Sequence, residues 1–185
     1  MRVISGNAGR IRLVPPKSLA RPSTDRLREA LFSILGNRVV DANVLDLFAG
    51  SGALGIEALS RGASKSVFVD LDREAVKAMQ GNLERTRLSA QAQVVGQDVF
   101  AWLKRYDGTR FDLIFADPPY VKGPSDTDYA AMLMVEFVLE PLLSEDGMLI
   151  VETGQTAPPK HAAGWRPVES RRYGGSHLHF FVAAG

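Results

Sequence analysis

Hydrophobic and polar positions change period repeatedly along most of the chain. From residue 43, short apolar runs typical of strands alternate with longer segments of helical pattern. The predicted strands cover residues 43–48, 66–70, 92–96, 111–116 and 147–153. The predicted helices cover residues 52–62, 72–86, 99–106 and 129–143. Repeated β-α units of this kind predict a mostly parallel sheet with helices on both faces.

The beginning of the chain departs from this repeat. Residues 1–16 predict two short strands around a Gly-Asn-Ala-Gly turn, closed by two prolines. Residues 21–35 predict a helix that Ser23 or Thr24 caps, with Leu27 and Leu31 on the face that packs against the rest of the protein.

The end of the chain predicts a hairpin in place of another β-α unit. Residues 165–183 contain two strand-like runs around Gly174 and Gly175, which would add an antiparallel strand to the sheet. We therefore expect an N-terminal hairpin-and-helix extension over residues 1–38 and an α/β domain with a seven-stranded sheet over residues 39–185.

Composition limits the class of protein. The chain has 185 residues, of which 45% are hydrophobic and 23% charged, as in an ordinary globular domain. It has no cysteine, so disulfides and thiolate metal sites are excluded, and we expect no metal. No apolar run would serve as a signal peptide or membrane span. We expect a cytoplasmic monomer that does not bind membranes.

Charge is divided unevenly along the chain, although the net charge is only +1. Residues 1–38 carry eight basic and two acidic residues, whereas the remainder carries 14 basic and 19 acidic ones. A basic N-terminal arm on an acidic body predicts contact with a polyanion. A solvated surface without a partner is the alternative.

A glycine-rich loop follows the first predicted β-α strand. Gly50, Gly52 and Gly55 form G-x-G-x-x-G, and Asp70 lies 20 residues after Gly50, at the end of the next strand. This spacing lets the chain turn sharply, approach a ligand and begin a helix, while the acid binds ribose hydroxyls. The motif alone fits NAD as well as other adenosine cofactors.

Asp46, which lies just before the loop, favours one of these cofactors over the others. A carboxylate there would repel a pyrophosphate but attract a cation, and residues 48–55 contain no Lys or Arg. The electrostatics therefore favour S-adenosylmethionine over a dinucleotide. Asp98, after the third of these strands, is placed to accept a hydrogen bond from the adenine amino group. It could also serve as a helix N-cap.

The strand at 111–116 runs directly into Asp117-Pro118-Pro119-Tyr120. In an open α/β sheet the ligand lies beyond the carboxyl ends of the strands, next to the first strand. The prolines stiffen the loop. The Asp117 carboxylate and the Pro118 carbonyl could accept both hydrogens of a planar exocyclic amine, while Tyr120 stacks on the base. Catalysis would then rest on positioning and electrostatics. A rigid turn with a helix-capping acid is the alternative.

These motifs together resemble a known family. Asp-Pro-Pro-Tyr is similar to the [N/D/S]-P-P-[Y/F] motif of class I methyltransferases that modify planar nitrogens. The stretch "RPSTDRLREALFSIL" is similar to R-P-T-x-D-R-x-R-E-x-L-F-N of bacterial 16S rRNA guanine-N2 methyltransferases of the RsmD type. The resemblance implies a Rossmann-like class I methyltransferase fold. It also implies methylation of one guanine N2 in 16S rRNA of the small subunit, with S-adenosylmethionine as cofactor.

The resemblance also implies roles for particular residues. The catalytic residues would be Asp117, Pro118, Pro119 and Tyr120. The cofactor-binding residues would be Asp46, Phe48, Gly50, Ser51, Gly52, Asp70, Leu71 and Asp98. The RNA-binding residues would be Arg10, Arg21, Arg26 and Arg28, which would contact phosphates.

Three other functions stay open at this point. An adenine-N6 methyltransferase acting on DNA or RNA would use the same Asp-Pro-Pro-Tyr motif. An NAD-linked oxidoreductase would need a loop that accepts pyrophosphate, against which Asp46 argues. An RNA-binding assembly factor without activity would tolerate damaged motifs, but neither motif is damaged. For Arg26, a surface ion pair with Glu29 is an alternative to RNA contact.

Overall fold

One sheet of seven strands forms the centre of the molecule, in the order β3-β2-β1-β4-β5-β7-β6. The computed structural model describes residues 1–17, 24–121, 123, 125–135 and 139–184. The strands are β1 Asn43–Leu47, β2 Lys65–Asp70, β3 Ala92–Gly96, β4 Phe111–Ala116, β5 Leu143–Thr153, β6 Trp165–Tyr173 and β7 Ser176–Ala183. Strands β1 to β5 pair in parallel, and β7 runs antiparallel between β5 and β6. The expected mostly parallel sheet with a C-terminal hairpin is confirmed.

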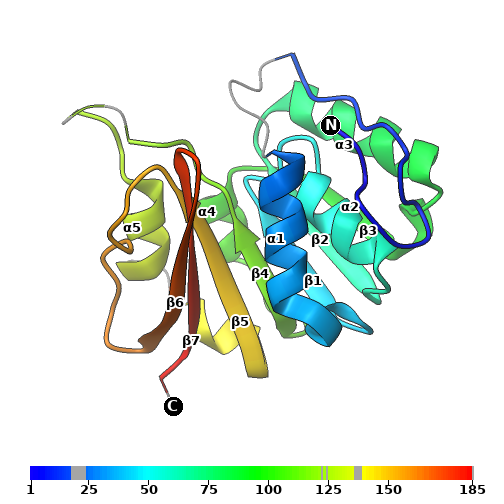
Figure 1. Cartoon of the computed structure of the whole chain (residues 1–185). Coiled ribbons are helices and arrows are strands. Elements are labelled where there is room, and N and C mark those ends of the chain that lie inside the picture. Colours follow the sequence, from blue (N-terminus) through cyan, green and yellow to red (C-terminus); the bar gives the residue numbers. More distant parts are fainter. Residues whose placement is uncertain (18–23, 122, 124, 136–138, 185) are drawn as a thin grey trace.

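The helices lie on both faces of this sheet (Figure 1). They are α1 Asp25–Leu35, α2 Ala53–Ser60, α3 Arg73–Thr86, α4 Val99–Leu103 and α5 Tyr129–Val135. Short 3-10 turns cover Gly36–Val39, Ser89–Gln91 and Glu140–Leu142. Helices α1, α2 and α3 belong to one apolar core, and α4 and α5 to the other.

Alternation along the strands produces these two cores. Val44 of β1 and Phe115 of β4 face the core that contains α1 to α3. Their neighbours Leu45 and Ile114 face the core that contains α4 and α5. Since successive strand residues point to opposite faces, a strand buried on both sides must be apolar at nearly every position. The buried runs of the sequence show this pattern.

The predicted helix over residues 129–143 is shorter in the structure. Helix α5 covers Tyr129–Val135, and residues 136–138 lie outside the described residues. Pro141 then lies in the 3-10 turn Glu140–Leu142, and β5 begins at Leu143. Proline lacks the N–H that an α-helix interior needs, so the predicted continuation of this helix to residue 143 is wrong.

The N-terminal segment is held by the helices of the sheet domain. The two predicted strands reduce to a single antiparallel bridge between Arg2 and Arg12. Glu57 of α2 accepts hydrogen bonds from the N–H groups of Ile4, at 2.7 Å, and Ser5, at 3.1 Å. A side chain of α2 thus satisfies backbone donors that a hairpin partner would otherwise pair.

Apolar contact joins the same segment to the body. Val3, Leu13, Leu27 and Leu31 are buried in the core that also contains α2 and α3. Residues 1–17 and α1 therefore share a hydrophobic core with the sheet domain.

Helix α1 runs against the direction of the parallel strands. Its C-terminal end leads through Gly36–Val39 to the start of β1, so its first turn lies toward the carboxyl ends of the strands (Figure 1). Thr24 caps this turn by accepting a hydrogen bond from the N–H of Leu27. No helix among the described residues combines the length and apolar character needed to cross a membrane.

Candidate active site

Acidic side chains mark the carboxyl ends of the five parallel strands. These are Asp46 in β1, Asp70 ending β2, Asp98 after β3, Asp117 after β4 and Glu152 in β5. The carboxyl edge of an α/β sheet is where ligands bind. The site has two parts. We call residues 46–55 with Asp70, Leu71 and Asp98 the glycine-loop half. We call residues 117–120 with Glu152 and Ser176 the Asp-Pro-Pro-Tyr half.

The glycine loop has the backbone that its sequence predicts. Gly50 and Gly52 have φ values of 54° and 74°, in the left-handed region that glycine occupies readily. Gly55 serves packing instead, since a Cβ there would lie 2.3 Å from the ring of Phe68 in β2. The loop therefore turns sharply and brings α2 against the sheet.

Asp46 is buried beneath this loop. Its side chain accepts a hydrogen bond of 2.9 Å from the N–H of Gly55. Burial raises the pKa of Asp46 to about 8, with the charge of Asp70 adding to the rise and the Gly55 N–H opposing it. In the absence of a cation, Asp46 is thus mostly protonated at neutral pH. A nearby ammonium group would favour the charged form.

Asp70 fixes the loop from the neighbouring strand. One carboxylate oxygen accepts a 2.7 Å hydrogen bond from the N–H of Gly50, and the other a 2.9 Å bond from the N–H of Asp72. A carboxylate has about four lone-pair sites, so acceptor capacity remains for two ribose hydroxyls. The next residue, Leu71, is 66% exposed and offers an apolar surface at the same edge.

Asp98 is the N-cap of α4, because its side chain accepts a 2.9 Å hydrogen bond from the N–H of Ala101. The capping alternative is thus confirmed, and a contact with adenine stays a prediction. Phe48 contacts the rings of Phe100 and Tyr129.

Ser51 contacts the N-terminal segment, and its predicted contact with the cofactor stays a prediction. It is buried, with its hydroxyl 3.7 Å from the sulfur of Met1 and its carbonyl bonded to Asn82. Its side chain helps to attach the N-terminal segment to the loop.

The charges of the glycine-loop half do not suit a pyrophosphate. Asp70 supplies a carboxylate, Asp46 supplies a second one when a nearby cation favours its charged form, and residues 46–55 contain no Lys or Arg to balance them. These residues fit a cofactor that carries a positive charge and ribose hydroxyls, as S-adenosylmethionine does.

The Asp-Pro-Pro-Tyr half begins beside the glycine loop. The N–H of Asp117 donates a 3.3 Å hydrogen bond to the carbonyl of Leu47, the last residue of β1. Asp117 is half-buried, Pro118 is buried and Pro119 is exposed. The two motifs, which are far apart in the sequence, therefore meet where β1 and β4 end.

Tyr120 is held by side chains of two neighbouring strands, β5 and β7. Its hydroxyl donates a 2.6 Å hydrogen bond to Glu152 of β5 and lies 2.9 Å from the hydroxyl of Ser176 in β7. Burial, and then the charge of Glu152, raise the pKa of Tyr120 above its ordinary value, so the hydroxyl keeps its proton. The ring packs on Gly154, where a Cβ would come within 2.8 Å of it.

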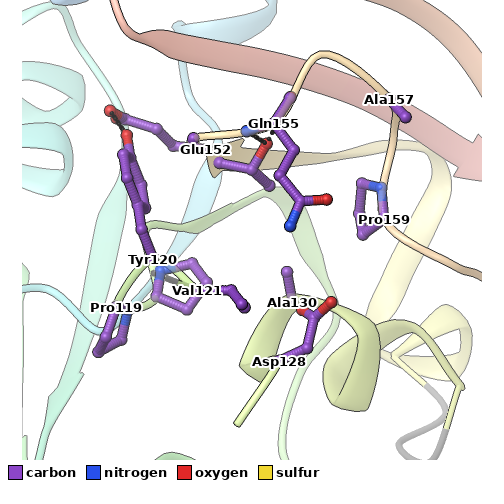
Figure 2. A pocket seen from close by; sticks show the side chains of 12 residues that line it. Pro119, Tyr120, Val121, Asp128, Ala130, Glu152, Gln155, Ala157 and Pro159 are labelled. Atoms are coloured by element: carbon purple, nitrogen blue, oxygen red, sulfur yellow. Dashed lines mark hydrogen bonds between the residues drawn. The ribbon is translucent and has the colours of Figure 1, made fainter. Parts of the chain in front are cut away.

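A pocket opens beside Tyr120, between the Asp-Pro-Pro-Tyr loop and the segment after β5. Figure 2 shows Tyr120 reaching Glu152 on one side, with Asp128 and Pro159 across the pocket. The wall also includes Pro118 and Gln155.

The predicted RNA-binding arginines have different positions. Arg10 and Arg26 are not buried, and Arg26 lies in the first turn of α1, toward the carboxyl edge. Arg21 lies outside the described residues. Among the described residues, no ion pair joins Arg26 to Glu29.

The prediction that Arg28 contacts RNA phosphates is wrong, because the residue is buried. Its side chain is 0% exposed and forms a 2.8 Å ion pair with Asp25. It also donates a 2.7 Å hydrogen bond to the carbonyl of Arg2. Arg28 therefore ties α1 to the N-terminal segment, where a phosphate cannot reach it.

Sequence reasoning missed Glu152, Ser176 and Gly154 in this site. Glu152 carried the same signal as Asp117, an acid at the end of a buried apolar strand, and could have been found. Ser176 and Gly154 depend on pairing between β5 and β7, which no local pattern specifies.

Among the described residues, no group of three or more His, Asp or Glu side chains is arranged to hold a metal ion.

Comparisons with known proteins agree on one family. The family model described as "Conserved hypothetical protein 95" matches residues 1–182. YlbH of Bacillus subtilis is 40% identical over 157 residues, or 82% of each chain. "Ribosomal RNA small subunit methyltransferase D" of Escherichia coli is 42% identical over 124 residues, 66% of this chain and 62% of that protein.

A solved structure matches the whole chain. A hypothetical protein of Thermus thermophilus superposes with a TM-score of 0.81 and 34% identity, covering 100% of this chain and 99% of that one. The protein named "Putative methyltransferase yhhF" of Escherichia coli also superposes with a TM-score of 0.81 and 33% identity, covering 99% of this chain and 97% of that one. With the strand order β3-β2-β1-β4-β5-β7-β6, these matches confirm the expected Rossmann-like class I methyltransferase fold.

Proposed function

Because the chain belongs to the conserved hypothetical protein 95 family, we propose that it methylates ribosomal RNA and uses S-adenosylmethionine as methyl donor. The membership confirms the resemblance to RsmD-type enzymes. The E. coli relative is named as a methyltransferase of small-subunit rRNA, and this name supports the same substrate class here.

One observation carries the proposal. The backbone bond from Asp117 to Leu47 joins the Asp-Pro-Pro-Tyr loop to the end of the strand that leads into the glycine loop. A methyl donor held by the glycine-loop half would thus lie next to an amine held by the other half. Such proximity supplies much of the rate enhancement in a transfer reaction.

We propose the exocyclic N2 amine of a guanine as the methyl acceptor. This amine is planar because its lone pair is delocalised into the ring, so it must rehybridise before it can form a new bond. The Asp117 carboxylate and the Pro118 carbonyl accept its two hydrogens and favour that change. The proton released after transfer passes to Asp117 or to water.

In the other half, Asp46 and Asp70 would hold the cofactor. Asp46 would pair with its ammonium group, Asp70 would bind its ribose, and Leu71 and Asp98 would lie against its adenine. Bound S-adenosylmethionine supplies a methyl group on a positively charged sulfur, which becomes a neutral thioether on transfer.

Arg10 and Arg26 would bind phosphates of the RNA. Neither is buried, and Arg26 lies toward the carboxyl edge of the sheet. Phosphate contacts position an RNA without specifying its sequence. We also propose a cytoplasmic location, because small subunits assemble there.

The nucleoside product tests this proposal. The protein is incubated with radiolabelled S-adenosylmethionine and free 16S rRNA, small subunits or DNA, and the products are digested and identified. We expect N2-methylguanosine from rRNA or small subunits, and its formation about 10²–10³-fold slower with Asp117→Ala. N6-methyladenosine would establish the adenine alternative, and no methylation of any substrate would favour the assembly-factor alternative.

A further inference from the structure

Glu152 carries a buried carboxylate oxygen whose role the proposed reaction does not yet explain. The residue is 4% exposed at the end of β5. Its Oε1 accepts the hydrogen bond from the Tyr120 hydroxyl. Its Oε2 is buried and has no hydrogen-bond partner among the described residues.

A buried carboxylate oxygen without a hydrogen-bond partner destabilises the folded protein. Buried polar atoms in folded proteins nearly always have partners, and a charged group loses more than a neutral one when it has none. Holding Tyr120 needs only one oxygen, and Ser176 is a second partner for the same hydroxyl. A carboxylate at position 152 therefore offers an acceptor beyond what the fold uses.

Glu152 lies in the part of the site where the base that receives the methyl group would bind. It lines the same pocket as Pro118, Pro119 and Tyr120 (Figure 2). Its bond to Tyr120 attaches it directly to the loop that begins at Asp117. Asp117 directly precedes Pro118 of this pocket, so a base held by Asp117 would lie next to the pocket that Glu152 lines.

We propose that Glu152 Oε2 accepts a hydrogen bond from N1–H of the target guanine, and that Glu152 is a specificity-determining residue. The inference rests on the proposed function, whose acceptor amine it shares. Guanine presents donors at both N2 and N1 on one edge, and an extruded base is recognised at that edge. Asp117 would take the N2 amine and Glu152 the adjacent N1–H.

This arrangement rejects the alternative base. Adenine has an amine, but its N1 is an acceptor with a lone pair that a carboxylate repels. A site built to receive a donor discriminates strongly against a ligand that lacks it, because the buried acceptor stays unpaired. Asp-Pro-Pro-Tyr accepts either amine, whereas Glu152 selects guanine.

The hydrogen bond from Tyr120 would fix the orientation of an amide side chain at position 152. In Glu152→Gln the amide oxygen would keep the hydrogen bond from the Tyr120 hydroxyl. The amide NH₂ must then occupy the position of Oε2. The substitution therefore changes an acceptor into a donor at that one atom.

The test uses 2-aminopurine, which has the N2 amine but an acceptor at N1. First the methylated guanine is mapped, and then RNA is made with guanine or 2-aminopurine at that position and assembled into the active particle. For the unaltered protein, we expect kcat/KM to be at least about 100-fold lower with 2-aminopurine. Glu152→Gln should reverse this preference, because its NH₂ donates to N1.

A second measurement does not require turnover. The fluorescence of 2-aminopurine rises when it leaves the base stack, so titration with each protein and S-adenosylhomocysteine reports capture of the base. Glu152→Gln should bind the 2-aminopurine RNA more tightly than the unaltered protein does. Glu145→Gln is the matched control, the same change at an exposed position of β5 outside the pocket, and it should leave the guanine preference unchanged.

Three outcomes would overturn the inference. Equal use of both bases by the unaltered protein shows that N1–H is not recognised. An unchanged preference in Glu152→Gln with a lower kcat shows that Glu152 acts only through Tyr120. If guanine itself is not methylated, the proposed function fails first and the inference fails with it.

Discussion

The two halves of the candidate active site hold their acids in different ways. In the glycine-loop half, Asp46, Asp70 and Asp98 accept hydrogen bonds from backbone N–H groups. In the Asp-Pro-Pro-Tyr half, Tyr120 and Glu152 are joined to each other by side chains, and one oxygen of Glu152 has no partner among the described residues.

This difference indicates when each half is complete. Backbone N–H groups are fixed once the loop and its helix form, so the glycine-loop half is built by folding itself. The other half keeps the Glu152 acceptor within a buried region, where only a further donor can satisfy it. We infer that the first half is pre-organised for a cofactor and that the second is completed by the acceptor base.

Removing Asp117 should have the largest effect, and this effect should fall on methyl transfer and not on cofactor binding. In Asp117→Ala, an acceptor that acts on the reacting amine is lost, so we expect kcat to fall by about 10²–10³-fold. The dissociation constant for S-adenosylhomocysteine should change less than about twofold, because the residue lies outside the glycine-loop half. Asp117→Asn keeps a side-chain oxygen and should retain more activity. Full activity in Asp117→Ala would refute the role of the carboxylate.

Removing Asp70 should damage the other half alone. Asp70→Ala deprives Gly50 and Asp72 of acceptors and removes the proposed ribose contact. We expect S-adenosylhomocysteine to bind about 10–100-fold more weakly, measured by calorimetry, for a loss of about 1–3 kcal/mol.

A neighbouring acid provides the control for Asp70. Asp72→Ala removes the cap of α3 and should cost about 1 kcal/mol of stability without weakening cofactor binding. Equal loss of binding in both variants would show that loop stability, and not a ribose contact, explains the result.

Asp46 gives the glycine-loop half a dependence on pH. Its pKa is raised in the folded protein to about 8, so the folded state holds a proton that the unfolded chain releases above about pH 4. Its contribution to stability is thus present at low pH and lost as the pH rises toward 8, by at most about 1.4 kcal/mol per pH unit.

Asp46→Asn should remove this loss of stability with rising pH, because an amide does not titrate. The unfolding free energy of the variant, relative to the unaltered protein, should increase from pH 5 to pH 8 in urea titrations. Asp41→Asn, at an exposed position, controls for loss of a carboxylate. A constant difference across this range would mean that Asp46 is not a buried acid in solution.

The smallest effect concerns the N-terminal basic residues, which lie outside both halves. Arg26→Glu should lower the slope of log K against log salt for RNA binding by about 1, as loss of one phosphate contact does. Arg105→Glu, an exposed change after α4 on the other face of the sheet, is the matched control. Equal slopes in the two variants would exclude Arg26 from the RNA surface.

Most of the strands and helices could be predicted because the hydrophobic residues of each segment follow the pattern of a strand or a helix. The run at 111–116 is apolar at nearly every position, and it became β4, buried between β1 and β5. The glycine loop was equally local, since Gly50 and Gly52 adopt the positive φ values that their spacing implies.

Arg28 shows what local patterns could not supply. It lies four residues before Phe32 and seven before Leu35, both buried, so its helical position was compatible with the core. Its charge argued for the surface, however, and the compensating carbonyl belongs to Arg2, 26 residues away. Burial of a charge depends on such distant partners, which a helical pattern does not contain.

The position of β7 governs the order in which the protein can acquire its shape. Because β7 lies between β5 and β6, β6 can join the sheet only through β7. Ser176, the first residue of β7, arrives with it, so Tyr120 gains this anchor only when β7 joins the sheet. Trp165 of β6 packs on Phe181 of β7, so its emission during refolding would report when β6 joins β7.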